Sequence, residues 1–145
     1  SNIGIVHGEV SGNYITIDID HDNGIFARLI DVFPPLGFGR IEQSGSGEGY
    51  HIPLRLITMP TWNNKTWKTS QGIVNIRARR CQTVAPPSIH PTGGVYKFIQ
   101  IGDIEYIENV AAIEHWLDEI SPRKRHTQQE CAPTTEKKHT NEETL

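Results

Sequence analysis

The chain has 145 residues, of which 36% are hydrophobic, and this composition predicts one modest soluble domain. No apolar run is long enough to span a membrane, so we expect no membrane partner. The formal net charge of −3 excludes a protein that holds duplex DNA through a strong basic field alone, and any contact with nucleic acid must be local.

The first predicted elements are two strands, near residues 3–10 and 14–20. The second strand ends in two carboxylates, Asp18 and Asp20, which share one face because side chains alternate along a strand. Two neighbouring carboxylates repel each other unless a hard cation lies between them. The spacing therefore predicts a divalent-metal site at the end of this strand.

Two helices are predicted, one on each side of a strand-rich middle. The first covers residues 23–33, with Asp22 or Asn23 as its cap and Pro34 as its stop. The second begins at Asn109 and carries an apolar stripe that ends at Ser121-Pro122. The intervening strands are predicted near residues 39–44, 49–57, 72–78, 81–85 and 95–100.

Alternation within two of these strands decides which polar groups can meet. In both 49–57 and 72–78 the even-numbered residues are mostly apolar. Side chains alternate between the two faces of a strand, so the polar side chains at odd-numbered positions lie together on the opposite face of each strand. If these faces belong to one sheet, they gather Asp18, Asp20, His51, Arg55, Asn75, Arg77 and Arg79. Carboxylates beside guanidinium groups suit a metal-bound polyphosphate.

Two loops are candidates for binding an anion. Prolines and Gly93-Gly94 shape the loop at 85–94, which would display Ser88 and His90 from a stiff turn. The Gly/Ser-rich run at 43–49 supplies backbone N–H groups just before His51, although it lacks the lysine of a P-loop.

The chain divides into a core and a polar end. Residues 122–145 carry charges of both signs with almost nothing apolar, which predicts a disordered tail or linker after a core at 1–121. The two cysteines, Cys81 and Cys131, lie far apart in the sequence and indicate neither a disulfide framework nor a zinc cluster, so we expect a reducing, cytoplasmic setting. It begins at Ser1 and its only methionine is Met59, so we expect it to be cut from a longer protein or processed.

Each motif also has an ordinary structural explanation. A D-x-D pair is common at strand ends where carboxylates face water, and isolated arginines usually lie on a solvated strand face. A Gly-Ser run is usually only a flexible turn. The shared face of three strands is what favours a functional site over these separate explanations.

Five stretches together carry a resemblance to a known family. They are N-I-G-I-V-H-G-E-V-S-G at 2–12, I-D-I-D at 17–20, S-G-S-G-E-G-Y-H at 44–51, I-V-N-I-R at 73–77 and A-P-P-S-I-H-P-T-G-G-V-Y at 85–96. This set resembles the bifunctional DNA primase/polymerase domain of the archaeo-eukaryotic primase superfamily, which is found in plasmid, phage and prophage replication proteins. The resemblance covers about residues 2–100.

The resemblance implies an α+β fold with a mainly antiparallel, RRM-like palm sheet and two flanking helices. It implies nucleotidyl transfer with Mg²⁺ or Mn²⁺ on Asp18 and Asp20, and a triphosphate contact at His51. Arg77, Ser88 and His90 would be further nucleotide contacts. The implied partners are a single-stranded DNA template, ribo- or deoxynucleoside triphosphates, and a helicase domain or subunit.

The sequence departs from the family pattern at two points. The family's third acidic position normally lies in V-D-I-R, whereas this chain has Val74-Asn75-Ile76-Arg77, so Asn75 would be a weakened third metal ligand. Members also usually carry a further segment before N-I-G-I-V, which this sequence lacks. Both departures leave a truncated or decayed copy as an alternative to an active enzyme.

Three hypotheses follow for the function. The first is an active primase/polymerase core, and the second is a catalytically impaired remnant that binds nucleotides or DNA. The third ignores the resemblance and takes D-x-D as the signature of a nucleotide-sugar glycosyltransferase, which also uses a metal-bound diphosphate.

Overall fold

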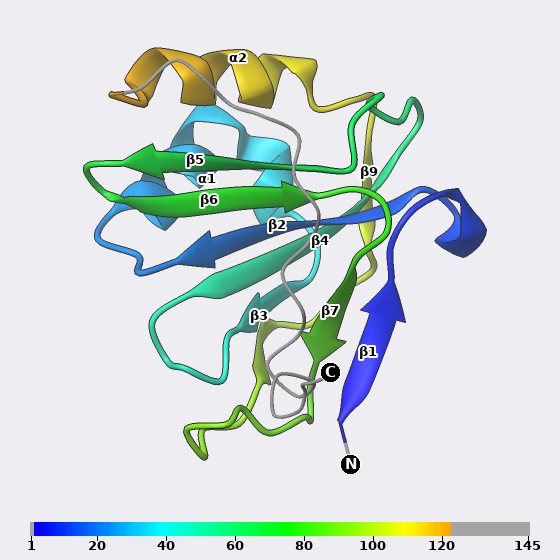
Figure 1. Ribbon diagram of the computed structural model, residues 1–145, viewed down its shortest axis with the longest axis vertical. Coiled ribbons are helices and arrows are strands. Elements are labelled where there is room, and N and C mark those ends of the chain that lie inside the picture. Colours follow the sequence, from blue (N-terminus) through cyan, green and yellow to red (C-terminus); the bar gives the residue numbers. More distant parts are fainter. Residues whose placement is uncertain (1, 123–145) are drawn as a thin grey trace.

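The computed structural model describes residues 2–122, so the tail predicted over 122–145 lies outside the described residues from 123 onward. The described chain forms a large seven-stranded sheet, a small two-stranded sheet and two α-helices (Figure 1). Nearly all strand pairs are antiparallel, and only β4 and β9 run parallel. The predicted α+β class with a mainly antiparallel sheet and two helices is therefore confirmed.

The large sheet has the order β5-β6-β2-β4-β3-β8, and β9 pairs with β4 outside this path. Its strands are β2 (Tyr14–Asp20), β3 (Ile41–Gln43), β4 (Tyr50–Leu56), β5 (Asn64–Thr69), β6 (Gly72–Arg77), β8 (Lys97–Gln100) and β9 (Glu105–Ile107). The small sheet pairs β1 (Ile3–Val6) with β7 (Gln82–Ala85). Of these strands, β5 and β9 were not predicted from the sequence.

Both helices pack on one face of the large sheet (Figure 1). They are α1 (Ile25–Val32) and α2 (Ala111–Ile120), and single 3₁₀ turns lie at η1 (Glu9–Ser11) and η2 (Pro34–Gly37). The N-cap of α1 is Gly24, so the prediction of Asp22 or Asn23 at that position was wrong by one or two residues. Asp22 still contacts the start of the helix, because its carboxylate accepts hydrogen bonds from the Gly24 and Phe26 N–H groups. Neither helix of the described chain is long and apolar enough to cross a membrane.

Strand β2 shows how the sequence separates the two faces of the sheet. Its isoleucines Ile15, Ile17 and Ile19 are fully buried in the core that the helices cover. The alternate residues, among them Asp18 and Asp20, therefore lie on the face away from the helices. The small sheet packs over one end of that second face, because His7, just after β1, contacts Thr16 of β2.

Strand β5 escaped prediction because its sequence, N-K-T-W-K-T, has almost no apolar alternation. Its helix-facing side chains instead pair with α2. Lys65 forms an ion pair with Glu114, and the Trp67 indole donates to the Asp118 carboxylate at 2.8 Å. These tertiary contacts, which no local pattern reveals, place β5 at the edge of the sheet under α2.

Candidate functional site

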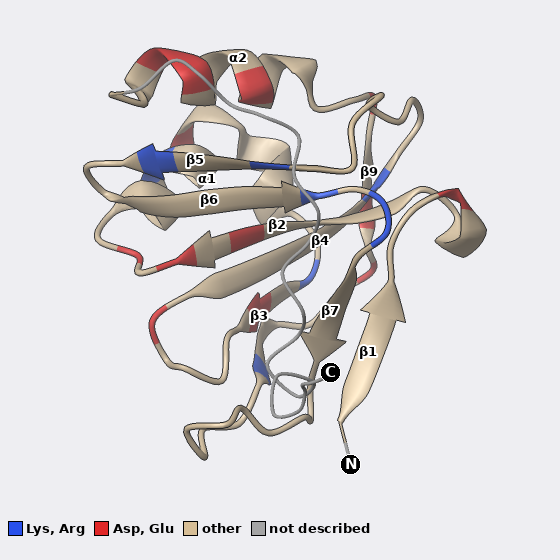
Figure 2. Cartoon of the chain, in the orientation of Figure 1, with Lys and Arg blue, Asp and Glu red and all other residues tan. Residues whose placement is uncertain are grey.

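Five strands each present one polar side chain in the same row across the face of the large sheet that lies away from the helices. Asp18 on β2 lies in register with His51 on β4 and with Asn75 on β6. The row continues to Glu42 on β3, opposite His51, and to Thr66 on β5, opposite Asn75. Opposed side chains on antiparallel neighbours touch, so these five residues form a continuous polar row. In Figure 2, red bands cross β2 and β3 while the end of β6 is blue.

Asp18 is the centre of this polar row and is only 5% exposed. Its Oδ1 lies 3.4 Å from His51 Nε2, and its Oδ2 lies 3.2 Å from Arg77 Nη2. Burial raises the pKa of the Asp18 carboxyl, but the positive charges of His51 and Arg77 outweigh burial and hold the pKa below its usual value. Asp18 is therefore ionised near neutral pH.

His51 lies between two acidic side chains in the same row. Its Nε2 faces Asp18, and its Nδ1 is 3.7 Å from Glu42 Oε1. Burial lowers the pKa of the imidazole, but Asp18 and Glu42 outweigh it and raise the pKa to about 9. The row thus holds a buried imidazolium at neutral pH, with its charge shared between two carboxylates.

Asp20 and Asn75 form the part of the site nearest the end of β2. Burial and the charge of Asp18 raise the pKa of Asp20. Asn75 Nδ2 donates to Asp20 Oδ2 at 3.2 Å, while Asn75 Oδ1 accepts from the Thr66 hydroxyl at 2.6 Å. The amide thus directs its donor, and not its oxygen, toward the carboxylates.

Asp18 and Asp20 are a suitable pair of ligands for a hard divalent cation. Burial raises the pKa of Asp20, and so does repulsion by Asp18, which a cation between the two carboxylates would relieve. Asp18 Oδ1 is also buried without a hydrogen bond from the described residues. Mg²⁺ is often held by one or two carboxylates, with substrate phosphates and water completing its shell. Within residues 2–122 there is no cluster of three or more His, Cys, Asp or Glu suited to a metal.

The loop at 85–96 brings His90 near this row but uses Ser88 differently. The buried Ser88 hydroxyl accepts a hydrogen bond from the Ile3 N–H at 2.6 Å and so anchors β1. The His90 and His51 rings each lie 5.9 Å from the ring of Tyr96, so both histidines neighbour this tyrosine. A Cβ on Gly94 would come within 1.9 Å of the Gly45 carbonyl, so glycine is needed where this loop meets the Gly/Ser-rich loop.

Two arginines of the expected patch lie elsewhere. Arg55 is opposite Tyr14, at the other end of β2 from Asp20. Arg79 follows the end of β6 and binds Glu9 of η1, with Nη2 2.8 Å from Oε2. The expectation that strand parity alone gathers all seven polar residues was wrong for these two, because the pairing partners and the end of β6 separate them from the row.

Sequence reasoning missed three residues of the site, Glu42, Thr66 and Tyr96. Glu42 lies in a predicted strand, and pairing that strand with 49–57 as a hairpin would have set it beside His51. Thr66 lies on the unpredicted strand β5, so no local signal identified it. Tyr96 closes the P-P-S-I-H-P-T-G-G-V-Y stretch but was treated only as part of that motif.

Comparison with known protein families gives a match over most of the chain. The model of a family described as bifunctional DNA primase/polymerase, N-terminal, matches residues 1–116. The matched region contains the whole polar row together with Asp20, Arg77 and His90. No curated protein matches the chain.

Proposed function

We infer the function from one premise, which is that the chain belongs to the bifunctional DNA primase/polymerase, N-terminal family. The proposed activity is nucleotidyl transfer in a plasmid- or phage-type replication protein. A 3′-hydroxyl, or a first nucleotide in primer synthesis, would attack the α-phosphate of a nucleoside triphosphate and release pyrophosphate. The observation that best supports this proposal is the register that sets Asp18 directly between His51 and Asn75.

Asp18 and Asp20 would hold Mg²⁺ or Mn²⁺, in keeping with the general metal dependence of the family. Such an ion, when bound, lowers the pKa of a hydroxyl nucleophile and stabilises negative charge on phosphate oxygens. The contribution of the chain is to hold both carboxylates on one strand face and in a fixed spacing. Asn75 is proposed as a weak further ligand, whose amide would have to rotate so that its oxygen, and not its N–H, faces the carboxylates.

His51 and Arg77 would bind the triphosphate. The buried His51 imidazolium is fixed by Asp18 and Glu42, so its charge is already in position before substrate arrives. Arg77 contacts Asp18 through one terminal nitrogen and keeps a partly exposed side chain, which leaves further guanidinium donors for phosphate oxygens. We propose His90 as an additional nucleotide contact beside Tyr96, and we assign Ser88 a positioning role at β1.

A catalytically impaired nucleotide- or DNA-binding remnant is the second candidate. One observation favours it, namely that Asn75 brings no negative charge and directs its amide N–H toward Asp20. A site with only two carboxylates neutralises less cation charge than one with three. This candidate predicts nucleotide binding without turnover.

We propose that the partners are a single-stranded DNA template and ribo- or deoxynucleoside triphosphates, with a helicase domain or subunit acting on the same DNA. We also propose a cytoplasmic location, where replication proteins of plasmids and phages act. Both proposals rest on the family, and the incorporation assay tests the DNA template and the nucleotides.

The test is incorporation of labelled nucleotides on primed and unprimed single-stranded DNA with Mg²⁺ or Mn²⁺. We expect product from the wild type and none from Asp18→Asn, while Asp31→Asn on the exposed side of α1 behaves as wild type. Incorporation that survives Asp18→Asn would overturn the site assignment. Binding without incorporation would favour the remnant, and transfer from a labelled nucleotide sugar would favour the glycosyltransferase.

A further inference from the structure

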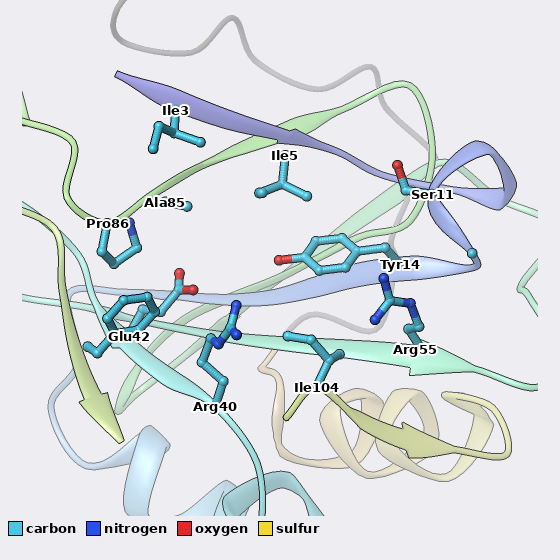
Figure 3. Close-up of a pocket in the computed structure, with 12 residues that line it drawn as sticks. Ile3, Ile5, Ser11, Tyr14, Arg40, Glu42, Arg55, Ala85, Pro86 and Ile104 are labelled. Atoms are coloured by element: carbon cyan, nitrogen blue, oxygen red, sulfur yellow. The ribbon is translucent and has the colours of Figure 1, made fainter. Parts of the chain in front are cut away.

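A pocket of about 780 Å³ lies between the small sheet and the face of the large sheet that lies away from the helices (Figure 3). Figure 3 shows Ile3, Ile5, Ala85 and Pro86 on one side of it, opposite side chains of the large sheet. Pockets of about 300–1,000 Å³ are typical of sites for small organic ligands. The space is therefore too large for a lone phosphate ion and suits a nucleotide-sized molecule.

The two sides of the pocket differ in chemistry. The side formed by β1 and β7 is apolar, and Phe98 and Ile104 extend the apolar lining. The side formed by the large sheet presents Arg40, Glu42 and Arg55 around Tyr14. An occupant that satisfies both sides must combine an apolar, preferably flat, body with an anionic group.

Arg40 and Arg55 are cations without an acidic partner among residues 2–122. Arg40 lies over the Phe98 ring at 5.4 Å and Arg55 lies over the Tyr14 ring at 5.8 Å, and neither forms an ion pair there. Arg40 Nε is also buried without a hydrogen-bond acceptor. Buried guanidinium donors cost free energy when they lack an acceptor, so Arg40 favours an anion in the pocket. Arg55 is only half-buried, and its unpaired charge can contribute to binding the same anion.

Glu42 does not cancel this positive charge, because its carboxylate already faces the His51 imidazolium. Tyr14, which is 6% exposed, keeps its proton because burial raises its pKa to about 12. Its hydroxyl can therefore donate to, or accept from, a polar group of the occupant. The large-sheet side of the pocket thus carries a net positive charge and a neutral hydroxyl.

We propose that this pocket binds a second nucleotide unit, with its phosphate between Arg40 and Arg55 and its sugar and base against the apolar wall of β1 and β7. The need for an amphipathic anion follows from the pocket alone, and its identification as a nucleotide rests on the proposed function. Glu42 lines the pocket and also faces His51, so the occupant lies next to the nucleotide that the polar row would hold. The unit comes either from a free nucleotide or from a strand of single-stranded DNA.

The test uses the full chain with EDTA, which removes divalent ions and with them metal-dependent binding at Asp18 and Asp20. Isoleucine methyl groups are labelled with ¹³C, and AMP or a short oligothymidylate is titrated into the sample. We expect the methyl signals of Ile5 and Ile104 to shift saturably while that of Ile113, a buried residue of α2, does not. A shift with AMP identifies a free nucleotide, and a shift with the oligonucleotide alone identifies a DNA strand.

Arg40→Gln and Arg55→Gln should each weaken this binding by about 10-fold or more, since each removes charged hydrogen-bond donors to phosphate. Arg55→Lys should recover part of the affinity because it keeps the charge. Arg28→Gln, on exposed α1, is the matched control and should bind as wild type. No shift with either probe, or wild-type affinity in both glutamine variants, would overturn the proposal. Pocket binding in a chain that incorporates no nucleotide would count against the proposed function only.

Discussion

Asp18 on β2 and His51 on β4 face each other across the sheet, with Oδ1 3.4 Å from Nε2 and both side chains buried. Each group fixes the charge of the other, because the carboxylate stabilises the imidazolium and the imidazolium stabilises the carboxylate. A buried ion pair of this kind contributes little net stability but is costly to break from one side. The pair is therefore better understood as a means of presenting charge than as a source of stability.

His51→Gln should lower the free energy of unfolding by about 3 kcal/mol, because Asp18 and Glu42 would lose the cation between them. Urea unfolding at neutral pH measures this. His115→Gln, on the exposed side of α2, is the control and should leave the midpoint unchanged. An equal midpoint for His51→Gln and wild type would show that the buried pair does not form.

Asn75→Asp should destabilise the metal-free protein and strengthen its response to Mn²⁺. In the wild type, the neutral Asn75 amide donates a hydrogen bond to the Asp20 carboxylate. A carboxylate at position 75 cannot donate this hydrogen bond and repels Asp20 instead. A cation bound by the added carboxylate would relieve that repulsion. Thermal melts with and without Mn²⁺ measure the difference, which should exceed that of wild type. Asn109→Asp adds the same charge at the exposed start of α2 and should not change the Mn²⁺ response.

Acid should destabilise the fold through His7. This side chain is buried and hydrogen-bonded to Thr16 and Thr83, and burial lowers its pKa to about 4. The unfolded chain therefore binds a proton between pH 6.5 and 4 that the folded chain does not, so the stability that His7 contributes is present above pH 6.5 and is lost as pH falls.

Between pH 7 and 5 the loss due to His7 should be about 2 kcal/mol. Denaturant unfolding at the two pH values measures it. In His7→Gln the drop in unfolding free energy should be smaller than in wild type by about that amount. Equal drops in the two proteins would contradict a neutral buried His7.

Asp118→Leu should cost about 1–3 kcal/mol, since it leaves the buried indole N–H of Trp67 without its carboxylate acceptor. The loss should also loosen the contact between α2 and the edge strand β5. Hydrogen exchange of β5 amides, compared with Glu119→Gln on the exposed side of α2, measures both effects. Unchanged β5 protection in Asp118→Leu would contradict the role of this contact.

The sequence predicts the parts of the fold whose signals are local. Strand β2 was predicted at its observed bounds, because alternating isoleucines mark it, and both helices were located by their apolar periodicity and stop signals. Strands β5 and β9 were missed, since β5 is held by pairing with β6 and by contacts to α2, and β9 is three residues long in parallel with β4. Propensity cannot reveal an element that only its tertiary partners stabilise.

The same limit applies to the candidate site. Parity correctly put Asp18, His51, Asn75 and Arg77 on one face, but it could not reveal which strands are neighbours. It therefore included Arg79, which lies beyond β6, and omitted Glu42, which becomes a partner of His51 only through the pairing of β3 with β4. The orientation of the Asn75 amide also depends on Thr66 of β5, a contact with no sequence signature.

The most direct test of the account is Mn²⁺ binding, followed by electron paramagnetic resonance of the free ion. We predict saturable binding by the wild type, a loss of affinity of about 10-fold or more in Asp18→Asn and Asp20→Asn, and wild-type affinity in Asp31→Asn. Mn²⁺ affinity that is unchanged in both Asp18→Asn and Asp20→Asn would contradict the claim that these two carboxylates form the cation site.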